Sequence, residues 1–160
     1  MKKLDVNYYS QNDNNLDLTD GARGNTQCNA TSHTMLVSYL KKDFVAKSTA
    51  NGYDEPEDYF KSKLIKYTTE RGNHQAFTKC LDKEFNIKSE WRYDLTQDDI
   101  IKSIDDNLPC VLGMSYKTSG HIVCCTGYSD EGLYINDPYG ERSSFSDFYA
   151  IINPGYGCDQ

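Results

Sequence analysis

The spacing of apolar residues changes at Pro109, and this change constrains the fold more than any other feature of the chain. Before Pro109, apolar residues recur at intervals of three and four positions, which is typical of helices that bury one face. After Pro109, short apolar runs alternate with turn residues, which is typical of strands. Helices followed by an antiparallel sheet make an α+β layout.

Four helices are expected before Pro109. Their expected positions are just after Cys28, from Pro56 to Gly72, from Gln75 to Phe85, and after Thr96. Pro56 is suited to the first turn of a helix. Thr96 and Asp99 have the spacing of a capping box, which satisfies backbone N–H groups at a helix start.

Three strands are expected after Pro109, at residues 110–116, 121–128 and 133–136. A short turn near Glu131 joins the last two as a hairpin. The N-terminal helices are expected to pack on this antiparallel sheet. At 160 residues the chain fits a single domain, residues 1–160.

Composition and charge exclude several classes of function. The formal net charge is −7 and no basic stripe is present, which disfavours nucleic-acid binding. No apolar run is long enough to span a membrane. The N-terminus has two lysines but no apolar segment of a secretory signal, so we expect synthesis in the cytoplasm. The six cysteines form no CxxC pair and are expected to be reduced thiols, mostly in the core.

Cys28 lies where a polar loop, residues 10–27, meets the first expected helix. The positive end of the helix dipole favours the thiolate form of a cysteine at this place. A thiolate can attack a carbonyl carbon. Cysteine is also often a small buried residue, and Cys28 by itself is compatible with that role.

Of the three histidines, only His121 stands in the expected sheet. His33 follows Cys28 on the same helix, and His74 opens another helix. His121 begins a strand, where a base can face a helix N-terminus across a cleft. An isolated histidine is also often a plain surface residue.

Asp137 ends the next expected strand, just before Pro138. A carboxylate there can hold a histidine in one tautomer and stabilise its charged form. If the turn is centred near residue 131, Asp137 falls short of the position opposite His121. Contact between the two side chains therefore requires a bulge, a longer turn or a bend. Residues 136–140 are also typical of a plain turn.

The order Cys, His, Asp is that of papain-like enzymes. Four short segments together resemble the bacteriocin-processing, double-glycine leader peptidase family of papain-like fold, and in particular its stand-alone members from bacteria and phages. The segments contain Gln11 in YYSQNDN, Cys28 in QCNATSHTML, His121 in GHIVCCTGY and Asp137 in YINDPYG.

This resemblance implies roles for the four residues. Cys28 would be the nucleophile, His121 the general base and then acid, and Asp137 the group that orients the histidine. Gln11 would complete an oxyanion hole with the backbone N–H of Cys28. Gln27 is the alternative donor, and either glutamine could instead be a buried structural residue.

Two points limit the resemblance. Many family members have glycine after the nucleophile, where this chain has Asn29. The transporter-fused members cleave after double glycine, and this chain has neither a transporter span nor an ATPase, so that substrate is not carried over.

A fainter resemblance joins the stretch TDGARGNTQC to the cysteine- and histidine-dependent amidohydrolases of cell-wall lysins, in which a nearby acidic loop can hold calcium. The residues of this chain that could offer such oxygens are Asp13, Asn15, Asp17 and Asp20. A solvated turn is the simpler explanation of these residues, so no cofactor is required.

The sequence therefore predicts a thiol-dependent amide hydrolase. The substrate expected from the resemblance is peptidoglycan, cut by an endopeptidase or lysin of phage or bacterial origin at the cell wall. Targeting would come from the domain itself or from a separate targeting or virion protein. The alternatives are a protein-processing or effector cysteine protease and a non-catalytic papain-like binding module.

Overall fold

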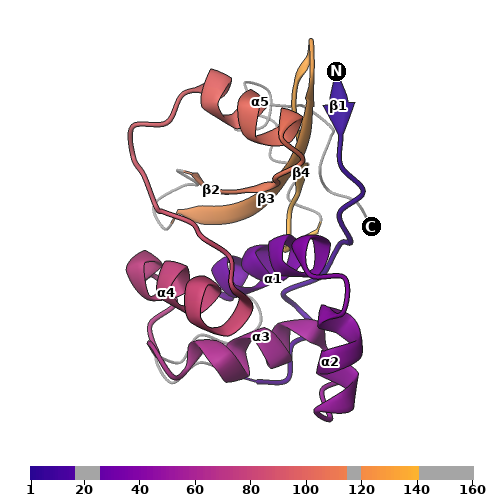
Figure 1. The fold of residues 1–160 in the computed structure, drawn as a ribbon, viewed down its shortest axis with the longest axis vertical. Coiled ribbons are helices and arrows are strands. Elements are labelled where there is room, and N and C mark those ends of the chain that lie inside the picture. The colour runs from indigo at the N-terminus through magenta and orange to yellow at the C-terminus, as the bar shows by residue number, and fades with distance from the viewer. Residues whose placement is uncertain (17–25, 115–119, 141–160) are drawn as a thin grey trace.

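The computed structural model describes residues 1–16, 26–114 and 120–140 (Figure 1). This part of the chain contains five helices and four strands. In chain order they are β1 (Lys2–Lys3), α1 (Cys28–Leu40), α2 (Phe44–Ala50), α3 (Pro56–Leu64), α4 (His74–Phe85), α5 (Gln97–Asp105), β2 (Cys110–Met114), β3 (His121–Ser129) and β4 (Gly132–Asn136). The sheet lies between α5 and the group α1–α4 in the view of Figure 1. The predicted α+β layout, with N-terminal helices on a C-terminal antiparallel sheet, is confirmed.

Most of the predicted helices form where local signals placed them. The capping box of α5 is present in both directions: Thr96 accepts from the Asp99 N–H, and the Asp99 carboxylate accepts from the Thr96 N–H. The prediction that the second helix ends at Gly72 was wrong, because α3 stops at Leu64. The Leu64 carbonyl then accepts from the N–H groups of Tyr67 and Thr68 in a turn that does not continue the helix.

Helix α1 is buried on nearly all sides, although its sequence suggested a single apolar face. Three of its buried hydroxyl groups are satisfied by backbone carbonyls. Thr34 donates to Ala30 and Ser38 donates to Met35 within the helix, and Ser32 donates to Ile122 of β3. The last bond, at 3.1 Å, ties the N-terminal half of α1 to the start of β3. A buried polar helix is tolerated when its polar groups are paired in this way.

Strand β3 is the centre of the sheet. It pairs antiparallel with β1, β2 and β4. Some residues of β3 that pair with β4 also pair with β1 or with β2. Because a strand has only two edges, β1 and β2 follow one another along the edge opposite β4. The two-residue strand β1 was not predicted, since its only distinguishing feature is this pairing at Gly127 and Tyr128.

The hairpin of β3 and β4 contains a register shift between Cys125 and Gly127. A Cβ atom on Gly127 would lie 2.4 Å from the carbonyl oxygen of Lys2, so only glycine allows β1 to approach so closely. The expected need for a bulge in this hairpin is therefore confirmed. Bulges bend and twist a strand, and this one lies between the turn and the functional end of the hairpin.

Two apolar cores lie on either side of α1. The core among the helices is built mainly from Phe44, Phe60, Leu64, Phe77 and Leu81. The core between the sheet and α5 is built mainly from Leu4, Ile104, Val123, Leu133 and Ile135. Over residues 1–16, 26–114 and 120–140, no helix has the length and apolar character required to cross a bilayer.

Candidate active site

His121 is the first residue of β3 and opposes Met114 of β2. Gly120 precedes it with a φ of 69°, a left-handed conformation that glycine adopts readily, and the strand begins at the next residue. The His121 side chain is buried, with 5% of its surface exposed. Its Nε2 lies 2.7 Å from Oδ1 of Asp137, so an N–H on that nitrogen donates to the carboxylate.

Asp137 follows β4 directly and is fully buried. In the shifted register, Cys124 opposes Asn136, which leaves Asp137 near the same end of the hairpin as His121. Diagonal neighbours of this kind are within reach of long and aromatic side chains. The same Oδ1 accepts from the backbone N–H of Tyr139 at 2.8 Å, which fixes the carboxylate in place. The expected contact between Asp137 and His121 is present.

Asn136, the neighbouring candidate for this contact, is used elsewhere. Its side-chain amide donates to the carbonyl of Val6 at 3.2 Å. This bond joins the N-terminal segment to the end of β4. Asp137, and not Asn136, is therefore the hydrogen-bond partner of His121.

Cys28 is the first residue of α1 and is partly exposed. It is hydrogen-bonded to His121, and the pKa of His121 reflects both of its partners. Burial alone would lower this pKa, but the hydrogen bonds and charges of Asp137 and Cys28 outweigh burial and raise it to about 9. The imidazole therefore has the thiol and the carboxylate as its two side-chain partners, and it is charged at neutral pH.

Gln11 is brought to the same place from the N-terminal segment. Its backbone N–H donates to the carbonyl of Pro138 at 2.7 Å, next to Asp137. Asn12 adds a bond to the carbonyl of Tyr139 at 3.3 Å. The Gln11 side chain is 1% exposed and lines the same cavity as Cys28 and His121.

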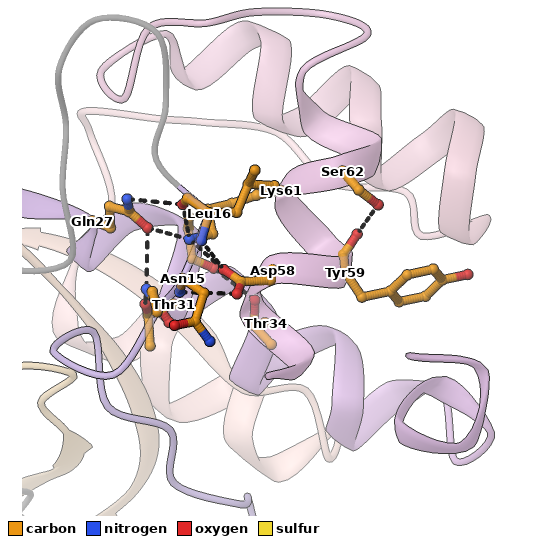
Figure 2. Close-up of polar contacts among 11 residues, drawn as sticks. Asn15, Leu16, Gln27, Thr31, Thr34, Asp58, Tyr59, Lys61 and Ser62 are labelled. Carbon is orange, nitrogen blue, oxygen red and sulfur yellow. Dashed lines mark hydrogen bonds and ion pairs between the residues drawn. The ribbon is translucent and has the colours of Figure 1, made fainter. Parts of the chain in front are cut away.

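Gln27 belongs instead to a buried polar network with Leu16, Thr31 and Lys61, shown in Figure 2. Its Oε1 accepts from Asn14 at 3.1 Å and from Lys61. Its Nε2 donates to the carbonyl of Leu16 at 3.2 Å. Both ends of the Gln27 amide are thus occupied in holding the segment that precedes α1.

The cavity beside Cys28 has a volume of about 1060 Å³. Asn29, at the position where many family members have glycine, is buried and donates to the carbonyl of Arg71 at 2.8 Å. Asn29 also lies 3.4 Å from Nδ1 of His74, whose ring stacks on Trp91 at a centroid distance of 3.7 Å. This cavity wall was not predicted, because its residues are far apart in sequence and share no motif.

The remaining histidine and the other described cysteines have different surroundings. His33 lies in the helical core against Phe77, and burial lowers its pKa to about 4. Burial raises the pKa of the thiols of Cys80 and Cys125 to about 12. The cysteines of residues 1–16, 26–114 and 120–140 are all reduced, as predicted, and Cys158 lies outside these residues.

The expected acidic loop is described only in part. Asp17 and Asp20 lie outside the described residues. Asn15 uses its backbone N–H to bind the carboxylate of Asp58 at 2.9 Å. Asp13 lies instead beside two carboxylates that the sequence did not single out, Glu55 and Glu57 at the start of α3.

A thiol at a helix N-terminus, facing a histidine and a buried carboxylate on a sheet, is the arrangement of a papain-like cysteine peptidase. The sequence matches the Peptidase_C39 like family over residues 3–153, and the chain belongs to this family. It is therefore a cysteine peptidase, as the four segments predicted. Comparison with curated proteins and with solved structures finds no match in either set.

Proposed function

We propose that the chain hydrolyses peptide bonds with Cys28 as the nucleophile and His121 as its acid–base partner. The Cys28 thiolate would attack the carbonyl carbon, and His121 would pass its proton to the leaving amine. Water would then hydrolyse the thioester, with His121 as the base. Asp137 would hold the imidazole in the required tautomer throughout.

One observation carries this proposal. His121 bonds to Cys28 on one side and to Asp137 on the other, at the edge of a cavity large enough for a peptide. The imidazole is also charged at neutral pH, because its two partners raise its pKa to about 9. None of the other described cysteines lies beside such a partner, and burial raises the pKa of the Cys110, Cys124 and Cys125 thiols.

We assign the oxyanion hole to the Gln11 side chain and the backbone N–H of Cys28. The position of Gln11 on the cavity wall supports this assignment, whereas the amide of Gln27 is engaged with Leu16 and Lys61. The N–H of Cys28 belongs to the first turn of α1, where backbone donors point out of the helix.

Gln11→Ala should lower kcat by roughly a hundredfold or more, because one donor to the developing oxyanion is lost. KM and the melting temperature should change little. Gln97→Ala is the matched control, since Gln97 lines the same cavity from the start of α5. If both variants retain normal kcat, Gln11 is not an oxyanion donor.

The pH dependence of kcat/KM should report the His121–Asp137 pair. Because the His121 pKa is raised to about 9, the imidazolium persists through neutral pH. Activity should therefore fall on the alkaline side near pH 9. Asp137→Asn removes the negative charge and should move this limb down by about one pH unit or more, and Asp137→Ala should cost more activity than Asp137→Asn. An alkaline limb that does not move in either variant would contradict the assigned role of Asp137.

For the substrate, we propose the peptide stems of peptidoglycan, as cut by phage or bacterial lysins. The residues that line the cavity are suited to binding a short peptide that carries carboxylates. Arg71 lines it, and guanidinium groups bind carboxylates well. Arg92 also lines it but is paired with Asp94 at 2.9 Å. Trp91 and its stacked partner His74 add a flat aromatic wall.

The test is digestion of purified peptidoglycan of several chemotypes, followed by mass analysis of the fragments. New peptide termini within one chemotype, absent with the Cys28→Ala variant, are the expected result. Cleavage of unfolded proteins and peptides at matched concentration, with intact peptidoglycan, would favour a protein-processing or effector protease instead. Cysteine peptidase activity would stand in both cases.

A further inference from the structure

Three carboxylates converge at the N-terminal end of α3. Asp13 comes from the N-terminal segment, and Glu55 and Glu57 come from the start of α3. One oxygen from each residue lies within 4.8 Å of an oxygen from each of the others. Negative groups so close together repel one another unless a positive charge stands between them.

Glu57 is the member of this cluster whose burial leaves one carboxylate oxygen without a partner to compensate it. Its side chain is 1% exposed, and its Oε2 has no hydrogen-bond partner among the described residues. An ionised carboxylate buried without a partner is costly.

The neighbouring groups offset only part of the negative charge of these three carboxylates. A carboxylate in the first turn of a helix is favoured by the helix dipole, and this explains one acidic residue in α3. The ammonium of Lys61 is on the same helix, but it is engaged by Asp58 at 2.8 Å and by Gln27. Asp58 in turn accepts from the backbone of Asn15 and Leu16.

We propose that Asp13, Glu55 and Glu57 bind one calcium ion. The donors are all carboxylate oxygens, which hard divalent cations prefer. Oxygens on opposite sides of a calcium ion are about 4.6–5.2 Å apart, so three oxygens within 4.8 Å fit one coordination sphere. Magnesium requires a tighter octahedron and keeps most of its waters, so calcium fits this site better. Asp13 is exposed, and water can fill the remaining positions there.

The ion would join the N-terminal segment to α3. Asp58 already holds Asn15 and Leu16 against this helix, and the ion would add a bridge two residues earlier, at Asp13. The same segment carries Gln11 to the cavity. Calcium is therefore a stabilising ligand of the fold that lies outside the reaction itself.

The experiment measures the melting temperature of the chelator-treated chain in millimolar calcium chloride and in magnesium chloride of the same ionic strength. Calcium should raise the melting temperature by about 5 °C or more, and magnesium by much less. Calorimetric titration with calcium should give one ion per chain. Neither readout depends on peptidase activity.

Glu57→Gln keeps the size of the side chain and should abolish both the thermal shift and the calorimetric signal. It should remain folded without calcium, since it removes the repulsion within the cluster. Asp13→Asn, at an exposed position, gives the same comparison if Glu57→Gln fails to fold. Glu131→Gln, in the turn between β3 and β4, is the matched control and should respond as the unmodified chain does.

Three results would overturn the proposal. The first is a chain whose melting temperature and calorimetry are unaffected by calcium. The second is an equal shift with calcium and magnesium, which indicates ionic screening only. The third is a Glu57→Gln or Asp13→Asn variant that binds calcium as tightly as the unmodified chain.

Discussion

We expect the Cys28→Ala variant to fold normally and to lose peptidase activity by roughly four orders of magnitude or more. Without the sulfur, the cavity keeps its base and its oxyanion donors but has no group to form the thioester. Cys28 is partly exposed at the start of α1, so replacing its thiol with a methyl group leaves little empty volume. The measurement is kcat/KM on a cleaved peptide, together with the melting temperature.

Cys110→Ala is the matched control for this variant. Cys110 is also partly exposed, but it lies in β2 without a histidine beside it, and burial raises the pKa of its thiol. Its loss should leave activity intact. Iodoacetamide near neutral pH should modify Cys28 far faster than any other cysteine, as mass analysis of peptides can show. Full activity in a folded Cys28→Ala protein would rule out the thiol mechanism.

The second large effect is expected from Lys61→Met. Lys61 is fully buried, pairs with Asp58 at 2.8 Å and also donates to Gln27 and Leu16, as Figure 2 shows. Methionine fills similar space but leaves the Asp58 carboxylate buried without its cation. Removing one partner of a buried pair costs about 3–5 kcal/mol in the free energy of unfolding.

For a chain of this length, such a loss corresponds to a fall in melting temperature of roughly 10 °C. Lys47→Met is the matched control, because Lys47 pairs with Asp43 at 2.7 Å while 61% of its side chain is exposed. Exposed pairs contribute about 1 kcal/mol or less. The double variant Asp58→Asn and Lys61→Met should recover part of the loss, since it leaves no buried charge. Equal melting temperatures for Lys61→Met and Lys47→Met would show that the buried pair does not stabilise the fold more than an exposed one.

The helices that the sequence predicted well are those whose signals are local. The capping box at Thr96 and Asp99 and the apolar spacing of α4 act within one or two turns, and both helices form where expected. Helix α2 was not predicted, since its seven residues are too few to show a period and Val45 faces solvent. The end of α3 was misplaced because the apolar spacing continues past Leu64 while the chain turns there.

The residues of the candidate site also divide into those with a local sequence signal and those placed by tertiary contacts. Cys28 and His121 each carry a local signal, a thiol at a loop–helix junction and a histidine at the start of a strand. The choice between Gln11 and Gln27 had no local answer. The proposed choice of Gln11 rests on two tertiary contacts: the bond of Gln11 to Pro138 places it on the cavity wall, and the bond of Gln27 to Lys61 holds Gln27 in the buried polar network.

What the sequence determined by itself is the presence of four of the five described helices and of strands β2–β4, the α+β layout, and the thiol and imidazole on separate layers. Only the tertiary structure decided that His121 meets Asp137, because their contact depends on the register shift between Cys125 and Gly127. It also decided that Asp13 lies beside Glu57, more than forty residues away in sequence. The physical reason is the range of the forces involved. Helix caps and apolar periods act between neighbours along the chain, whereas a catalytic pair or an ion site requires distant segments to be held together by packing.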